Sequence, residues 1–286
     1  MKSAGRPVTG GPLFCAALLL TIVSPIAAAL EPKDTSSPRS SVELARPSSV
    51  LANEQCATAS GAMHEPVQIH RVSDGDTIVL SDGRKVRIIG INAPELSKKS
   101  ESALRADAEA AREFVEQLAA DSTETTLVVG EESVDRYGRV LAHVFFDKKR
   151  SLAAELLARG LAAASAVSPN TRCAELNQHI EHIARQQRQG VWQNPNNPWF
   201  GKTVPAKSIK GFHILTAVVK TVRKRKQIWD IELSNGVLIR AKTSLLPENE
   251  ANKLTNKTIE VRGWFGQNNN FTSVRLHHRI NLTVHP

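Results

Sequence analysis

Three short segments of the chain carry residue types that together could hydrolyse a phosphodiester bond. They are residues 74–77 (Asp-Gly-Asp-Thr), residues 87–95, and residues 135–139 (Asp-Arg-Tyr-Gly-Arg). Their carboxylates can hold a hard cation, their arginines can bind a phosphate through paired N–H donors, and a glutamate can move a proton. Each segment alone has an ordinary explanation, because Asp-Gly is common in turns and Arg-Tyr-Gly can close a hairpin. Their order and combination carry the prediction.

The elements that would position these segments are short strands and three helices. Apolar residues at helical spacing from Leu104 to Leu118 predict a helix. Ser151 to Gly160 and Thr171 to Gly190 read as two more, each with a capping residue and a glycine stop. Strands are predicted by β-branched and alternating runs at residues 67–72, 77–80, 85–91, 125–129 and 140–146. The order indicates a small barrel with helices packed on it.

The last third of the chain has a different pattern. Residues 193–208 contain three prolines and several asparagines, which is typical of a linker. Beyond it, five strands are predicted at residues 212–222, 228–233, 237–241, 258–265 and 271–274, with residues 244–254 as a short helix or a loop. This pattern predicts a second small all-β domain of OB-like type, 209–286.

With these motifs in place, residues 67–192 resemble the staphylococcal nuclease (thermonuclease) family. The family pattern of Asp-Gly-Asp-Thr, an arginine-bearing strand that ends in Asp-x-Pro-Glu, then Asp-[Lys/Arg]-Tyr-Gly-Arg and a closing Trp is present in order, with Trp192 as the close. The resemblance implies a mainly β fold with α, an OB-type five-stranded barrel with packed helices, over residues 63–192.

By this resemblance Arg87 and Arg139 match the two catalytic arginines and Glu95 matches the catalytic glutamate. The arginines would bind the negative charge that gathers on the phosphate in the transition state. Glu95 would act as a base on the attacking water, and Pro94 would limit the directions in which its carboxylate can point.

Asp76 matches a carboxylate ligand of calcium in the same family. Asn92 and the carbonyl of Ala93 could share the Ca²⁺ with it, with Asp74 one shell further out and Thr77 orienting a ligand.

Two departures from the family pattern stand out. Asn92 replaces the family aspartate and removes one negative charge, so we expect weaker calcium binding or tolerance of other divalent cations. Residues 162–169 lack the tyrosines that line the family's nucleotide pocket, and Tyr137 is the chain's single tyrosine. The odd separation of Arg87 and Asn92 would also place them on opposite faces of a regular strand. Both can face one site only if a bulge interrupts the strand, and we expect this interruption at Gly90.

The basic charge of the chain indicates a polyanionic partner. The formal net charge is +9, and from residue 202 onward there are 15 Lys and Arg against 5 Asp and Glu. On the predicted strand 258–265, alternation places Arg262 and Trp264 on the face opposite Val261, so we expect both to contact substrate. Arg136 and Tyr137 are expected to contact it from the first domain. Trp229 is instead expected in the core.

The N-terminal residues read as an export signal. Residues 1–29 combine Lys2 and Arg6 with an apolar run and small residues, as a secretory signal peptide does, and residues 30–62 read as a flexible spacer. We therefore expect a periplasmic or extracellular protein with no stable membrane span after signal cleavage. In that compartment Cys56 and Cys173 are expected to form a disulfide, with two unpaired thiols as the alternative.

The sequence thus predicts an exported, calcium-dependent nuclease acting on DNA and RNA. Two alternatives remain open. One is a catalytically weak or inactive nuclease-like protein of the cell envelope that binds nucleic acid without cutting it, and the other is a general polyanion-binding protein. The nine histidines show no metal-ligand spacing, so a zinc site has no support.

Overall fold

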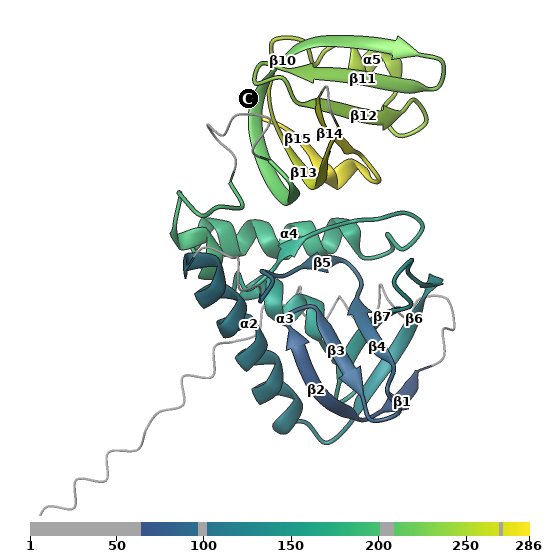
Figure 1. Ribbon diagram of the computed structural model, residues 1–286, viewed down its shortest axis with the longest axis vertical. Coiled ribbons are helices and arrows are strands. Elements are labelled where there is room, and N and C mark those ends of the chain that lie inside the picture. The colour runs from purple at the N-terminus through teal and green to yellow at the C-terminus, as the bar shows by residue number, and fades with distance from the viewer. Residues whose placement is uncertain (1–63, 97–101, 201–208, 269–270) are drawn as a thin grey trace, which may run out of the picture. The chain divides into compact units, whose positions relative to one another are not determined.

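The computed structural model describes residues 64–96, 102–200, 209–268 and 271–286. Residues 64–200 form short strands with helices between and after them (Figure 1). In chain order the elements are β1 (Glu65–Val67), β2 (Ile69–Asp74), β3 (Thr77–Leu80), β4 (Lys85–Ile88), β5 (Ile91–Asn92), α2 (Ser102–Ala120), β6 (Thr125–Val134), β7 (Val140–Phe146), β8 (Arg150–Ser151), α3 (Leu152–Ala158), β9 (Ala163–Ala164), α4 (Ala174–Gln186) and the 3₁₀ turn η1 (Gly190–Gln193).

The first barrel is closed by one bent strand. Its sheet order is β1-β6-β7-β4-β3-β2, with β8 paired to β7. β1 and β2 are separated only by Gln68, and β1 pairs with β6 while β2 pairs with β3. The sheet therefore returns on itself, with β4 and β7 as a parallel pair. The predicted OB-type five-stranded barrel is confirmed.

The helices form where apolar spacing and caps predict them, with one correction. α2 packs on the core through buried Ala111, Val115 and Leu118. Ser151 caps α3, where its hydroxyl accepts the backbone N–H of residue 154 at 3.4 Å. The predicted start of the third helix at Thr171 is wrong, because α4 begins at residue 174 after an N-cap that makes no side-chain cap bond.

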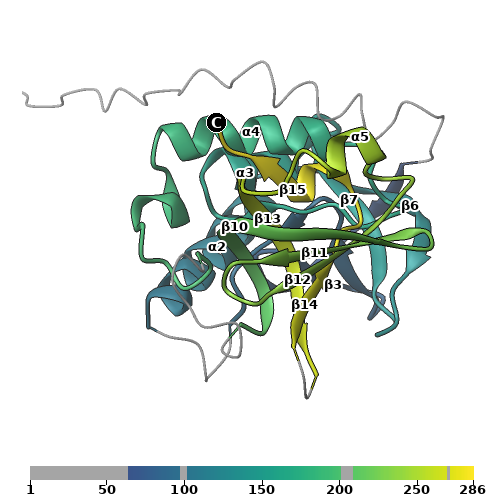
Figure 2. The ribbon, with the colours of Figure 1, turned by 90° about the horizontal axis from the view of Figure 1, so that it is seen from above.

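The second barrel has the same strand order as the first. It contains β10 (Gly211–Arg225), β11 (Ile228–Leu233), β12 (Leu238–Lys242), α5 (Glu248–Ala251), β13 (Thr258–Gln267), β14 (Thr272–Arg275), the 3₁₀ turn η3 (Arg279–Asn281) and β15 (Leu282–Val284). The order runs β10-β11-β12-β14-β13, and β13 pairs again with β10. β12 and β14 are parallel, and α5 lies between the third and fourth strands as α2 does in the first barrel. Figure 2 shows β10 and β11 as a long hairpin beside β12.

The core of the second barrel follows strand alternation. Alternate residues Trp229, Ile231 and Leu233 of β11 are all buried. The indole Nε1 of Trp229 donates to the carbonyl of Leu246 at 2.8 Å, so its polar atom is satisfied inside the core. The prediction that Trp229 is a core residue is confirmed.

A buried charge network joins α4 to the second barrel. Arg262 on β13 contacts Glu181 on α4 at 2.7 Å and Glu260 at 2.6 Å, and Arg185 on α4 contacts Glu260 at 2.6 Å. Arg262 also donates to the carbonyl of Ala164 at 3.3 Å. Figure 1 shows α4 between the strands of the two barrels.

An apolar cluster continues this interface. It brings Trp192 and Trp199 together with Phe212 and Ile214 of β10. Trp199 belongs to the segment predicted as a linker, yet it is buried, as is Asn197. Asn197 bonds to Asp107 of α2 and Trp199 packs on β10, so the described part of that segment contacts both barrels. The described residues of the two barrels belong to one compact unit. The predicted domain limits at 192 and 209 stay a prediction.

The predicted signal peptide (1–29) and the predicted spacer (30–62) lie outside the described residues. Among the residues that the structure describes, no helix combines the length and apolar character that crossing a membrane requires.

Candidate functional site

A break in the strand after Ile88 brings Arg87 and Asn92 together. Gly90 has φ of +88°, a conformation that a side chain disfavours, and an added Cβ would lie 2.3 Å from the amide nitrogen of Asn177. The chain turns here between β4 and β5, and the Arg87 guanidinium then donates to Asn92 Oδ1 at 3.1 Å. The predicted interruption at Gly90 is confirmed, as a turn between two strands.

Asp76 lies at the centre of this cluster. It is buried, and its Oδ2 accepts the backbone N–H of Ala93 at 2.7 Å and pairs with the Arg87 guanidinium at 2.9 Å. Its Oδ1 accepts the Thr77 hydroxyl at 3.1 Å. The predicted cation ligands Asp76, Asn92 and Ala93 are therefore brought together, and Thr77, expected to orient a ligand, is hydrogen-bonded to Asp76.

A second carboxylate, Asp74, lies beside Asp76. Its Oδ1 accepts the backbone N–H of Asp76 at 3.1 Å. Burial first, and then the negative charge of Asp76, raises the pKa of Asp74 to about 7. Two adjoining carboxylates that are partly or fully buried disfavour each other's ionisation, and a bound cation would relieve that repulsion.

The donors of this cluster fit a hard cation in part. Asp74 and Asp76 supply carboxylate oxygens of the kind that Ca²⁺ takes. Asn92 Oδ1 is instead bound to Arg87, and the Asn92 amide donates to the Ala93 carbonyl at 3.3 Å. Among the described residues no group of three or more His, Cys, Asp or Glu side chains has the arrangement of a metal site. Asn92 would have to release Arg87 to serve as a ligand.

Arg139 is positioned by the turn between β6 and β7. Asp135 Oδ1 accepts the backbone N–H groups of Tyr137 and Arg139 at 2.9 and 3.0 Å, and Asp135 Oδ2 pairs with Arg139 Nε at 2.8 Å. Burial opposes ionisation of Asp135, but these hydrogen bonds and the Arg139 charge outweigh it and lower its pKa. The ionised carboxylate fixes the direction of the Arg139 guanidinium.

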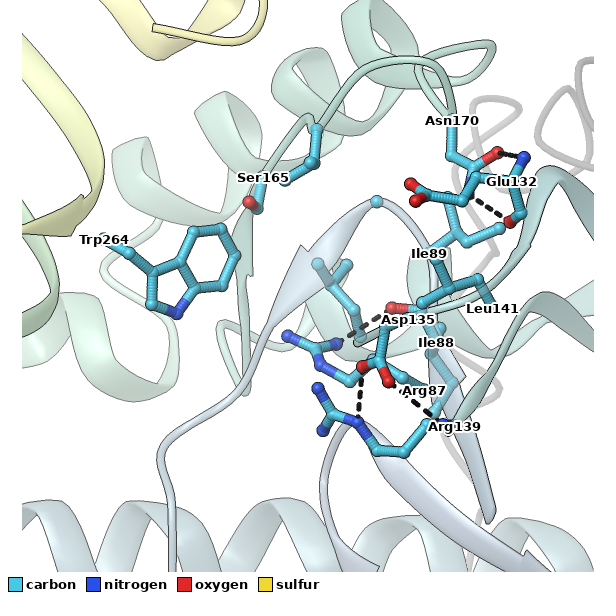
Figure 3. A pocket seen from close by; sticks show the side chains of 13 residues that line it. Arg87, Ile88, Ile89, Glu132, Asp135, Arg139, Leu141, Ser165, Asn170 and Trp264 are labelled. Carbon is cyan, nitrogen blue, oxygen red and sulfur yellow. Dashed lines mark hydrogen bonds and ion pairs between the residues drawn. The ribbon is translucent and has the colours of Figure 1, made fainter. Parts of the chain in front are cut away.

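One pocket brings the two arginines together (Figure 3). Arg87 and Arg139 line it with Asp135, and their guanidinium groups point toward the indole of Trp264. The remaining lining residues come mainly from β4, β5 and the loop after β9: Ile88, Ile89, Gly90, Ile91, Glu132, Leu141, Ser165, Val167 and Asn170. The pocket therefore combines two cationic side chains with one aromatic side chain from the second barrel.

The other predicted site residues lie outside this lining. Glu95 is exposed, three residues after Asn92, and the pocket wall formed by the described residues does not include it. Arg136 and Tyr137 lie exposed at the tip of the β6–β7 hairpin, where Arg136 donates to the Tyr137 hydroxyl at 2.6 Å and stacks over its ring. These two residues remain available to a ligand at the rim.

The expectation that Arg262 contacts substrate is wrong. Its side chain is only 3% exposed and is bonded to Glu181 and Glu260 at the interface between the barrels. Alternation correctly placed it on the same face as Trp264, but that face is covered by α4 at Arg262 and open only at Trp264, which is 45% exposed. Sequence reasoning could not find Glu181, because it lies 81 residues from Arg262.

Cys173 is buried against Val128 and Phe145. Its predicted partner, Cys56, lies outside the described residues, so the disulfide between them stays a prediction. Peptide mapping of the unreduced protein would test it.

Comparison with known proteins agrees with the geometry of the first barrel. The family model for the staphylococcal nuclease homologue matches residues 85–194, which contain Arg87, Asn92, Glu95 and Arg139. A micrococcal nuclease of Shigella flexneri is 30% identical over 145 residues, which cover 46% of this chain and 77% of that protein. The chain belongs to the staphylococcal nuclease family.

Two further relatives show how far the similarity extends. The thermonuclease of Staphylococcus hyicus is 29% identical over 141 residues, 48% of this chain and 82% of that protein. The endonuclease YhcR of Bacillus subtilis is 28% identical over 172 residues, 56% of this chain but only 14% of that protein. These relatives are nucleases, so a nuclease hydrolase is the activity that the comparisons support.

Proposed function

We propose that the chain hydrolyses phosphodiester bonds in DNA and RNA in a calcium-dependent reaction. The observation that carries this proposal is the pocket that Arg87 and Arg139 both line. Two guanidinium groups in one pocket bind the charge that develops on the oxygens of a phosphate under attack.

Both arginines retain N–H donors for that phosphate. A guanidinium group has five N–H donors. Arg87 directs donors to the Ile88 carbonyl at 2.9 Å, to Asn92 and to Asp76. Arg139 uses its Nε on Asp135, and its guanidinium lies over the Tyr137 ring at 5.6 Å. Among the described residues no hydrogen bond or ion pair occupies its two terminal amino groups. Arg139 therefore offers the freer fork for bidentate binding, while Arg87 is held rigidly at the pocket wall.

Glu95 is the residue we assign as general base. It lies three residues after Asn92, the last residue of β5, and Pro94 restricts the backbone before it. Bound Ca²⁺ would supply positive charge that polarises the phosphate and neutralises the adjoining carboxylates. The residues that would hold it are Asp76 and Asn92 with the Ala93 carbonyl, and Asp74 adds a second carboxylate beside them.

A basic pocket on the second barrel supports nucleic acid as the substrate. Arg225, Arg240, Lys242 and Arg275 line it, against one carboxylate, Asp230. The loop after β9 connects the two pockets, because Ser165, Val167 and Asn170 line the arginine pocket and Ser168 lines the basic one. A strand bound in the arginine pocket can continue along this positive surface.

The test is cleavage of plasmid DNA, single-stranded DNA and RNA by the purified chain without residues 1–29, with calcium and with chelator. Arg139→Lys should lose about 10²- to 10³-fold in rate, because a lysine cannot reproduce the paired donors. Glu95→Gln should lose a similar factor. Arg84→Lys is the matched control, since Arg84 lies on the β3–β4 turn with Glu65 and Asp82 as its partners.

Wild-type rates in Arg139→Lys and Glu95→Gln would overturn the assignment. Binding of nucleic acid with no cleavage under any cation would instead favour the alternative, a nuclease-like binding protein. The bonds that Asn92 and Asp76 make to Arg87 are the observation behind this alternative, since they hold some N–H donors of Arg87 away from substrate.

Export of the protein is a separate proposal that rests on residues 1–29, and detection of the processed chain outside the cytoplasm would test it.

A further inference from the structure

Trp264 reaches the arginine pocket because it shares a strand face with the buried interface. On β13, Glu260, Arg262 and Trp264 alternate onto one side. Glu260 and Arg262 are buried against α4 and β9, where Arg262 bonds to the Ala164 carbonyl. The next residue on that side is Trp264, and it lines the pocket together with Ser165, the residue after Ala164. The contacts at Arg262 therefore set where the indole lies.

The indole is held on one side and open on the other. Phe212 of β10 meets it in a T-shaped contact with centroids 5.2 Å apart and an angle of 68°. Trp199 supports Phe212 in turn, at 5.5 Å and 66°. Trp264 nonetheless keeps 45% of its surface exposed, and it is the one aromatic residue among those described that line the pocket. A braced, exposed aromatic ring is suited to stacking on a flat ligand.

We infer that Trp264 forms a nucleobase-stacking subsite that the second barrel contributes to the pocket of the first. Arg87 and Arg139 lie opposite the indole (Figure 3). A nucleotide whose phosphate contacts those guanidinium groups would place its base toward Trp264. Because every base has a π-face, this subsite holds nucleotides without selecting among bases. The inference rests on the proposed function for the arginines.

The position of the subsite requires the two barrels to be fixed relative to each other. Asn281 of η3 donates to the Ala166 carbonyl at 2.8 Å, and Gln178 of α4 donates to the Ile280 carbonyl at 3.2 Å. These bonds add to the buried Arg262–Glu181 contact at 2.7 Å. The interface therefore positions Trp264 with respect to the loop that carries Ser165.

The experiment compares oligonucleotides that carry or lack a base beside the cleaved phosphate. A series of single-stranded DNAs, each with one abasic sugar at a successive position, is cleaved by the wild type and by Trp264→Ala, and kcat and KM are measured for each bond. One stacked base changes affinity by about 5- to 150-fold. The wild type should lose that factor, mainly in KM, when the base beside the cut is absent. Trp264→Ala should show the same reduced efficiency on both substrates.

Two matched variants separate stacking from folding. Trp264→Phe should keep most of the preference for the base-bearing substrate. Val218→Ala removes another exposed apolar side chain of the same barrel and should behave as the wild type. A full base preference in Trp264→Ala would overturn the inference, as would an equal loss in Val218→Ala.

Failure of the proposed function would look different. If the wild type cuts no substrate, the same oligonucleotides are compared by fluorescence polarisation in the presence of calcium. A base-dependent affinity that Trp264→Ala abolishes then supports the subsite without catalysis. Equal affinity of the wild type and Trp264→Ala for every oligonucleotide rules it out.

Discussion

Replacing Arg262 with Met should destabilise the whole protein, because it leaves buried carboxylates without their partner. The Arg262 and Glu181 side chains are 3% and 1% exposed, and Glu260 is 5% exposed. Removing one partner of a buried ion pair costs about 3–5 kcal/mol, whereas the intact pair adds little net stability. Arg185 remains near both carboxylates, at 2.6 Å from Glu260 and 3.5 Å from Glu181, which places the expected loss toward the lower end of that range.

The assay is urea and thermal unfolding followed by circular dichroism. A loss of this size corresponds to roughly 6–20 °C in Tm for a unit of this length. Lys220→Met is the control, because Lys220 pairs with Glu232 at 3.4 Å on the surface, and its loss should change stability by no more than about 0.5 kcal/mol. Arg262→Met should also separate the unfolding of the two barrels into two transitions if the network couples them.

The dependence of stability on pH in the acid range gives an independent readout of the same network. Burial works to raise the pKa of Glu260, but hydrogen bonds from Arg185 and the charge of Arg262 outweigh it and lower the pKa to about 2. A carboxylate with a lowered folded-state pKa stabilises the protein above its unfolded pKa, and that stability disappears as the pH falls from about 4.5 toward 2. In Arg262→Met the folded-state pKa of Glu260 should lie closer to its unfolded value, so the loss of stability between pH 4.5 and 2 should be smaller. A variant with wild-type stability, a single unfolding transition and an unchanged loss of stability in acid would refute the reasoning.

Three further predictions concern the cation, pH and salt. Asn92→Asp should lower the calcium concentration for half-maximal cleavage, because it restores a ligand charge; an unchanged or higher requirement would show that residue 92 is not a ligand. Burial, with a smaller effect of Arg172, lowers the pKa of His143 to about 4. The free energy of unfolding should therefore fall by an amount of the order of 3 kcal/mol as the pH drops from 6.5 to 4. His143→Leu should reduce that fall in acid titrations. Arg240→Gln should reduce the slope of log affinity against log salt by about one, with no change in an equivalent Lys220→Gln control.

Local patterns in the sequence predicted most of the fold. β7 and β11 have the bounds that the alternating runs indicate, residues 140–146 and 228–233. α2 follows the apolar spacing of Ala108, Ala111 and Val115, all of which are buried. These elements are determined by residues close together in the chain, so the pattern carries the information needed.

The site could be predicted only where its parts lie on one segment. Arg87 and Asn92 are an odd number of positions apart, so facing one site required a break in the strand, and the break lies at Gly90. For Arg262 the same alternation gave the correct face and the wrong environment, because periodicity says which residues share a side and not what covers that side. Arg262 is covered by α4, which is distant in sequence. The residues around Glu181 of α4 give no indication that it pairs with an arginine.

The second barrel is therefore a part of the candidate site and not an appendage to it. Removing residues 205–286 would take away Trp264 and the basic pocket, but it would also expose the apolar cluster around Trp192 and leave Glu181 without Arg262. Loss of activity in such a truncation would not distinguish a binding role from loss of folding. Because Trp264 lies at the exposed end of a strand face whose inner part makes the interface, a single side chain can be changed there while the docking contacts remain. The role of this barrel in the reaction is therefore decided by substitutions at the indole.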